Sequence, residues 1–274
     1  MKTIIVPTDF SAISNNAVNY AVDLARETNC SIILFHAYQV PVSMTDVPII
    51  LISVEDLQKN AETKMAEVKK SLEQSTGGSL KFYAETKLGD TVDELEDLCA
   101  RIRPFAVVMG TKGATGLERV FFGSTTLTAI KHLSWPVIVV PPGKKYSKIK
   151  KIGFACDFKE VVDTTPTHFI KDFVKEFNAE LHVLNVDYKN SHFRPETPEE
   201  SAFLHTMLAD LNPKYDFIED ENIEAGIEKF AEKNNLDLVI TIPKKHKLLE
   251  GLFKKSHTKE LIFHSHLPIM CVHE

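Results

Sequence analysis

Short apolar runs alternate with longer segments of helical periodicity along the first half of this chain. In the longer segments apolar residues recur every three or four positions, as at Ile13, Ala17, Ala21 and Leu24, which is typical of an amphipathic helix. Strands that alternate with helices of this length indicate an α/β fold with a parallel, doubly wound sheet. The expected strands cover residues 2–6, 31–37, 80–85, 106–109 and 136–140.

Capping residues and glycines set the expected helix ends. Ser11 is expected to cap the first helix, and Gly77-Gly78 to end a long polar helix that starts near residue 53. Gly89-Asp90 leads into a helix with one apolar face, and a further helix is expected over residues 124–133. Each expected helix joins two expected strands, as a parallel sheet requires.

The same succession of patterns returns in the second half of the chain. Two copies of ordinary domain size predict a tandem of one fold: a first domain over residues 1–143, a linker over 144–150 and a second domain over 151–274. Pro166 suits a first helical turn, so we expect the opening helix of the second copy to start late, near Thr165. The matched segments are 2–10 with 151–158, 29–36 with 178–185, the fourth strand with 236–241, and 135–140 with 267–272.

Composition narrows the class of protein. The chain has 274 residues, of which 43% are hydrophobic and 26% charged, as in a soluble globular protein. Its apolar stretches are of strand length, so we expect no membrane helix, and the apolar run at the N-terminus is too short for a signal peptide. A net charge of −6 argues against a nucleic-acid binder. Four scattered cysteines suit reduced thiols, and we expect a cytoplasmic protein.

A glycine motif follows the fourth expected strand and reads Gly110-x2-Gly113-x9-Gly123-Ser124-Thr125. Glycines let backbone N–H groups approach an anion closely, and Gly123-Ser124-Thr125 opens a helix whose N-terminus favours phosphate. The motif is neither a P-loop nor a dinucleotide fingerprint. The glycines would also suit a tight turn or a helix cap, but Gly116 and the hydroxyls add more donors than a turn requires.

Asp9 comes directly after the first expected strand. In an open parallel sheet, ligands bind outside the carboxyl ends of the strands, where this carboxylate would accept a hydrogen bond from a ribose hydroxyl. A carboxylate at the start of a helix is also favourable to the helix dipole without any ligand. The glycine motif nearby favours the ribose interpretation.

These motifs together resemble the universal stress protein family: Pro7-Thr8-Asp9-Phe10-Ser11, a strand ending at His36-Ala37, and the glycine motif before a Pro-Val-Ile-Val-Val strand. The resemblance implies a five-stranded parallel sheet of order 3-2-1-4-5 in each copy. It also implies an ATP site in which Asp9, beside Pro7 and Thr8, holds the ribose, and the backbone of Ala37 meets adenine. The phosphates would lie on Gly110, Gly113, Gly123, Ser124 and Thr125.

The second copy departs from this motif. Ile242, Lys245 and Lys255 stand opposite Gly110, Gly113 and Gly123, although Ser256 and Asp157 are retained. A Cβ at three phosphate-approach positions should close the site, so we expect a degenerate second domain with a structural or partner-binding role.

Metal binding and dedicated catalysis are not favoured. The histidines His257, His264, His266 and His273 lie close in sequence, but their spacing matches no structural zinc site. Phosphoryl transfer needs a base and a metal-binding carboxylate, and Glu118 is the glycine loop's one acid.

We therefore expect a nucleotide-dependent stress-response or signalling module that binds ATP, with AMP or ADP as alternatives and with or without Mg²⁺, in its first domain. A slow ATPase or phosphoryl-transfer enzyme and a nucleotide-free scaffold are the other hypotheses. An unidentified protein and a second tandem chain in a homodimer are the expected macromolecular partners, with no nucleic acid and no membrane. The last strands of the two copies are apolar, and we expect them to pair as an intrachain pseudo-dimer.

Overall fold

The computed structural model describes residues 2–40, 53–111, 123–188, 197–243, 261–262 and 265–273. By its internal contacts the chain divides into two compact units, Met1–Trp135 and Pro136–Glu274. The expected linker, residues 144–150, lies inside the second unit. Among the described helices, none combines the length and the apolar character needed to cross a bilayer.

The first unit contains a parallel sheet in the order β3-β2-β1-β4. Apolar side chains on both faces of β1 and β4 are fully buried, among them Ile4, Ile5 and Val107, as expected for a sheet covered by helices on both sides. The strands are β1 (Thr3–Pro7), β2 (Ser31–Tyr38), β3 (Phe82–Leu88) and β4 (Ala106–Gly110).

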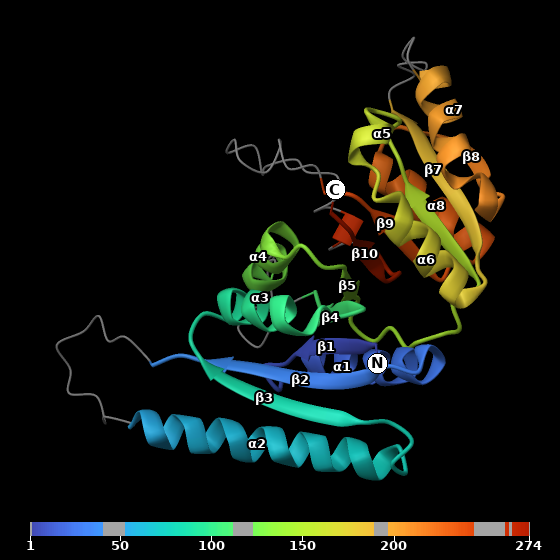
Figure 1. Ribbon diagram of the computed structural model, residues 1–274. Coiled ribbons are helices and arrows are strands. Elements are labelled where there is room, and N and C mark those ends of the chain that lie inside the picture. Colours follow the sequence, from blue (N-terminus) through green and yellow to red (C-terminus); the bar gives the residue numbers. More distant parts are fainter. Residues whose placement is uncertain are drawn as a thin grey trace. The chain divides into compact units, whose positions relative to one another are not determined.

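Among the described residues, three helices join these strands and a fourth follows the last strand; side chains cap the N-termini of the first three. The Ser11 hydroxyl accepts a hydrogen bond from the Ser14 amide at the start of the first helix, which confirms the predicted cap. Ser53 and Asp90 cap the next two helices in the same way. The longest helix lies along β3 (Figure 1). The helices are α1 (Ala12–Thr28), α2 (Val54–Ser75), α3 (Thr91–Ile102) and α4 (Ser124–His132).

The second unit contains a sheet in the order β5-β10-β9-β6-β7-β8. Its strands from the second copy, read from β8, follow the predicted order 3-2-1-4-5 and are parallel. β5 is antiparallel to β10, with Val139 opposite Ile269, which confirms the predicted pairing of the two last strands. The strands are β5 (Val137–Val140), β6 (Lys151–Ala155), β7 (Glu180–Tyr188), β8 (Lys214–Asp220), β9 (Leu238–Thr241) and β10 (Ile269–Cys271).

The helices of the second unit include one short helix that was not expected. The opening helix of the second copy does start late, at Thr167 with Pro166 as its N-cap residue, but a single turn precedes it. A helix of four residues has no apolar periodicity to reveal it. The described helices are α5 (Val161–Thr164), α6 (Thr167–Phe177), α7 (Thr197–Leu208), the 3₁₀ turn Ala209–Leu211 and α8 (Ile223–Asn234).

The third strand of the first unit differs from its predicted bounds. It was expected over residues 80–85 but runs from Phe82 to Leu88. The apolar alternation ends early, whereas the pairing with β2 continues as far as Tyr38 opposite Leu88. Backbone pairing, which has no side-chain signature, therefore sets the end of this strand.

Candidate functional site

The loop that follows β1 is fixed by hydrogen bonds around Thr8. The Thr8 amide donates to the Phe35 carbonyl at 2.8 Å, and its hydroxyl accepts from the Phe10 amide at 3.0 Å. The same hydroxyl lies 3.1 Å from the Ser14 hydroxyl in the first turn of α1. Phe10 has a φ of 64°, in the left-handed region that side chains with a Cβ rarely adopt.

Asp9 lies in this loop with an exposed side chain. Its Oδ1 accepts a hydrogen bond from the Ser11 amide at 3.0 Å, so the carboxylate also stabilises the start of α1, as the alternative interpretation of Asp9 expected. Pro7 is the last residue of β1 and is buried. The loop thus presents the Asp9 carboxylate at the carboxyl end of the first strand.

The end of β2 lies beside this loop. The pairing of β2 with β1 stops at Phe35, whereas its pairing with β3 continues through Ala37 to Tyr38. Ala37 therefore has a strand neighbour on one side only among the described residues. A backbone in that position suits the expected contact with a base.

The described ends of the glycine motif lie close together. The Thr126 hydroxyl, in the first turn of α4, donates to the Gly110 carbonyl at the end of β4 over 2.8 Å. Gly123 is the N-cap residue of α4 and supplies no side-chain cap, and Ser124 and Thr125 are exposed in the first turn. Gly113, Glu118 and the rest of residues 112–122 lie outside the described residues.

Gly110 also has a packing role that the sequence did not reveal. A Cβ built on Gly110 would lie 2.6 Å from Ile13 Cγ2 and 3.1 Å from the Ile13 carbonyl oxygen. A Cβ at 2.6 Å would force Ile13 or α1 to shift, so the absence of a side chain at residue 110 favours the close approach of α1 to β4. This packing role of the glycine does not depend on whether a phosphate binds nearby.

The loop after β1, the end of β2 and the described ends of the glycine motif all lie at the carboxyl ends of the strands of the first sheet. β1 is the neighbour of β4, with Ile4 opposite Ala106, and also of β2 on its other side. The chain leaves β1 toward β2, and β4 joins on the opposite side, which is the topological switch point where open α/β sheets bind ligands. Thr8, Asp9, Ala37, Gly110 and the start of α4 thus come together, although they are far apart in sequence.

Two residues near this end of the sheet, His36 and Lys64, were not predicted from the sequence to belong to the site. His36 Nδ1 lies 2.8 Å from the Thr8 carbonyl oxygen, and its ring is 4.5 Å from that of Phe10. The ammonium group of Lys64 on α2 lies over the Phe10 ring, 5.8 Å from its centre. The position of His36 at the end of a predicted strand could have marked it as a site residue. Lys64 could not be told from the other charged residues of a polar helix.

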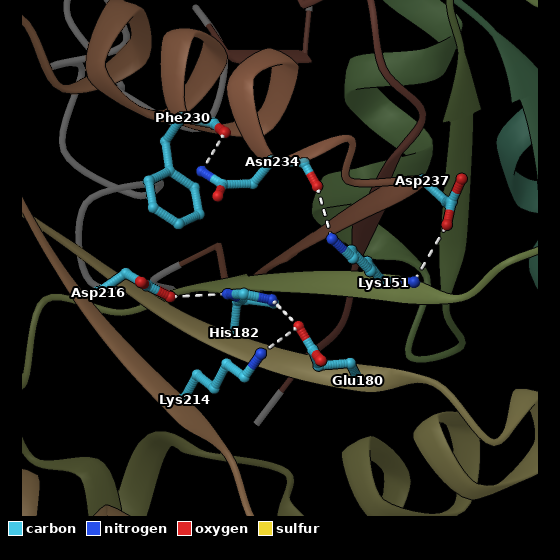
Figure 2. Close-up of polar contacts among 8 residues, drawn as sticks. All are labelled: Lys151, Glu180, His182, Lys214, Asp216, Phe230, Asn234 and Asp237. Carbon is cyan, nitrogen blue, oxygen red and sulfur yellow. Dashed lines mark hydrogen bonds and ion pairs between the residues drawn. The ribbon is translucent and has the colours of Figure 1, made fainter.

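In the second unit a buried histidine, His182, lies within a cluster of more exposed charged groups that was not predicted from the sequence. Figure 2 shows His182 on β7 between two carboxylates: Nδ1 lies 2.7 Å from Asp216 Oδ2, and Nε2 lies 2.5 Å from Glu180 Oε1. Lys214 binds the same Glu180 oxygen at 2.8 Å, and Phe230 of α8 packs against the imidazole. In the first unit the corresponding position holds the buried, apolar Ile33.

The cluster is suited to stability rather than to chemistry. The hydrogen bond from Lys214, and after it that from His182, lowers the pKa of the Glu180 carboxyl. A general base needs a ring nitrogen that can reach its substrate, and both nitrogens of His182 already face carboxylates. Among the described residues, no group of three or more histidines, cysteines, aspartates or glutamates is arranged to hold a metal ion. His257 and His264 lie outside those residues.

Comparison with known proteins accounts for both halves of the chain. A sequence model of the Universal stress protein family matches residues 1–141 and again residues 148–273. A universal stress protein of Methanocaldococcus jannaschii is 30% identical over 152 residues, which are 53% of this chain and 84% of the relative.

A solved structure that spans nearly the whole chain has the same fold. A universal stress protein from Archaeoglobus fulgidus has 18% identity and a TM-score of 0.75, with 99% of this chain and 98% of that chain covered. A universal stress protein solved in complex with cAMP matches 52% of this chain and 98% of its own, with 20% identity and a TM-score of 0.40. With the α/β sheet seen in both halves and the family model matching each of them, the chain belongs to the universal stress protein family as a tandem of two such domains.

Proposed function

We propose that the first repeat binds ATP at the carboxyl ends of β1, β2 and β4. The hydrogen bond of 2.8 Å from the Thr126 hydroxyl to the Gly110 carbonyl carries the proposal. It joins the first turn of α4 to the end of β4, at the switch point where Asp9 also lies. A helix N-terminus suits the phosphates of a nucleotide, and a carboxylate at the same end of the sheet suits its ribose hydroxyls.

The expected roles follow from the chemistry of each group. Asp9 accepts hydrogen bonds from ribose hydroxyls, with Pro7 and Thr8 supporting its loop, and the backbone of Ala37 meets the adenine ring. Amides at the start of α4 and the exposed hydroxyls donate to the phosphate oxygens, where the helix dipole favours negative charge. The phosphate-binding residues are Gly110, Gly113, Gly123, Ser124 and Thr125.

We infer a binding module rather than a dedicated enzyme. Rapid phosphoryl transfer needs a base and a carboxylate-bound metal beside the γ-phosphate, and Asp9 is assigned to the opposite end of the nucleotide. The bound nucleotide would regulate a stress-response or signalling contact with another cytoplasmic protein. Mg²⁺ would be held mainly by the phosphates, and AMP or ADP would leave part of the loop unused.

The experiment is calorimetric titration of the full chain with ATP, ADP, AMP and cAMP, the last because one universal stress protein has been solved with it. We expect one ATP site per chain. The two repeats provide a matched control: Asp9→Asn should weaken ATP binding, whereas Asp157→Asn, at the corresponding position of the second repeat, should not. Gly113→Lys, which introduces the residue type found at Lys245, should abolish binding.

Two equivalent sites, or equal affinity in wild type and Asp9→Asn, would contradict the assignment. A phosphate-release assay with ATP and Mg²⁺ distinguishes a nucleotide-binding module from an ATP-hydrolysing enzyme. Turnover well below the range of about 1–100 s⁻¹ found for kinases is expected.

A further inference from the structure

The carbonyl that precedes the site aspartate accepts a hydrogen bond from the second strand in both repeats. In the first repeat His36 Nδ1 donates to the Thr8 carbonyl at 2.8 Å, and because a carbonyl only accepts, Nδ1 carries the proton. In the second repeat Asn185 Nδ2 donates to the Cys156 carbonyl, also at 2.8 Å. We call this contact the carbonyl clamp. Two different side chains make it at matching places.

The backbone around the carbonyl clamp is repeated as well. The Thr8 amide donates to the Phe35 carbonyl at 2.8 Å, and the Cys156 amide donates to that of Leu184 at 2.9 Å. The amide two residues later donates back to the Thr8 hydroxyl at 3.0 Å, or to the Cys156 thiol at 3.4 Å. The loop geometry is therefore the same, although the side chains that maintain it have changed.

The clamped loop contains a strained residue immediately after the aspartate. Phe10 and Phe158 have φ values of 64° and 48°, which cost free energy for a residue with a Cβ and persist only where the surroundings enforce them. In the first repeat the His36 ring also packs against Phe10, with 4.5 Å between the ring centres. His36 thus contacts the backbone on one side of Asp9 and the ring on the other.

We propose that His36 is a positioning residue for nucleotide binding: by holding the Thr8 carbonyl and the Phe10 ring it fixes the direction of the Asp9 carboxylate. This inference rests on the proposed function, since Asp9 is the group assigned to the ribose. His36 acts through Asp9 and need not touch the nucleotide. Asn185 shows that an asparagine side chain is a sufficient donor for the same contact.

The experiment is a double-mutant cycle on ATP affinity in the full chain. His36→Leu removes the donor, and we expect binding weaker by about tenfold, as for the loss of one partly buried hydrogen bond. His36→Asn, the side chain found in the second repeat, should bind within about twofold of wild type. In the Asp9→Asn background His36→Leu should have no further effect, because its target is already absent. Asn185→Leu is the matched control and should leave ATP affinity unchanged.

Hydrogen exchange of the ligand-free protein tests the same loop without nucleotide. His36→Leu should speed exchange of the Phe10 amide, and His36→Asn should restore its protection. Unchanged Phe10 exchange in His36→Leu would overturn the proposal whether or not ATP binds. Additive effects in the cycle would also overturn it, because they would mean that His36 acts without Asp9. A wild-type chain that binds no adenine nucleotide would instead contradict the proposed function, and with it the positioning role that depends on that function.

Discussion

At the scale of single residues, two separate features favour a residue without a side chain at position 110. The sequence predicts the close approach of a phosphate. The structure adds the close approach of α1, since a Cβ on residue 110 would lie 2.6 Å from Ile13 Cγ2. The sequence pointed to the first, because the spacing of the glycine motif is local. The second depends on how a helix packs over a strand nearly one hundred residues away, which no local pattern encodes.

Gly110→Ala should therefore reduce stability as well as affect the site. Overpacking against the first turn of α1 is expected to lower the free energy of unfolding by about 1–3 kcal/mol. Urea denaturation followed by circular dichroism measures this change. Ile13→Ala should recover part of the loss, because it removes the nearer of the two contacts. Equal stability of Gly110→Ala and wild type would show that α1 can shift away without cost.

At the scale of the elements, apolar periodicity predicted most of the strands and helices, and hydroxyl and carboxylate caps predicted where helices begin. Elements without such signals were missed or misjudged: the single turn α5, and the last residues of β3, which only backbone pairing maintains. The polar cluster around His182 was missed for a related reason. Charged residues alternating along β7 and β8 look like a solvated face, and only the contact of Phe230 on α8 with the buried His182 ring sets that residue apart.

The cluster should make the second unit sensitive to acid. The pKa of Glu180 is lowered in the folded protein by Lys214 and then by His182, so its ionised form is favoured by folding. That stabilisation is present above the unfolded pKa of a glutamate, about 4.3, and is lost as the pH falls through the lower, folded value. Urea titrations at a series of pH values should show a smaller acid loss in Glu180→Gln than in wild type.

Glu67→Gln, on an exposed position of α2, is the control and should keep the acid profile of wild type. If Glu180→Gln and wild type lost stability in parallel over the acid range, the ionised form of Glu180 would contribute nothing to folding.

At the scale of the whole molecule, the division of the chain by contacts does not coincide with its division by sequence repeat. The first repeat ends with β5, yet β5 belongs to the second unit and is antiparallel to β10. The apolar strands at both repeat ends, together with the family resemblance, predicted this pairing, because an unpaired apolar edge is unfavourable. The exact limits of the two domains, 143 and 151, stay a prediction.

A fragment of residues 1–143 should self-associate, because its β5 lacks the β10 partner that it has in the full chain. Sedimentation at several concentrations should show dimers for the fragment. Val139→Lys introduces charge opposite the position of Ile269 and should weaken the association, with circular dichroism as the check that the fragment is folded. A fragment that stayed monomeric at high concentration would count against β5 as a pairing surface.

The placement of β5 also affects where the chain can be split into two polypeptides. A gene split at the boundary of the duplication would give one product that carries a strand belonging to the other product's unit. A split at codon 136 would follow the contacts instead, with Met1–Trp135 on one polypeptide and Pro136–Glu274 on the other. The boundary between the sequence repeats and the boundary between the contact-defined units thus fall at different points of the chain, so an exchange of the whole first repeat would carry β5 with it.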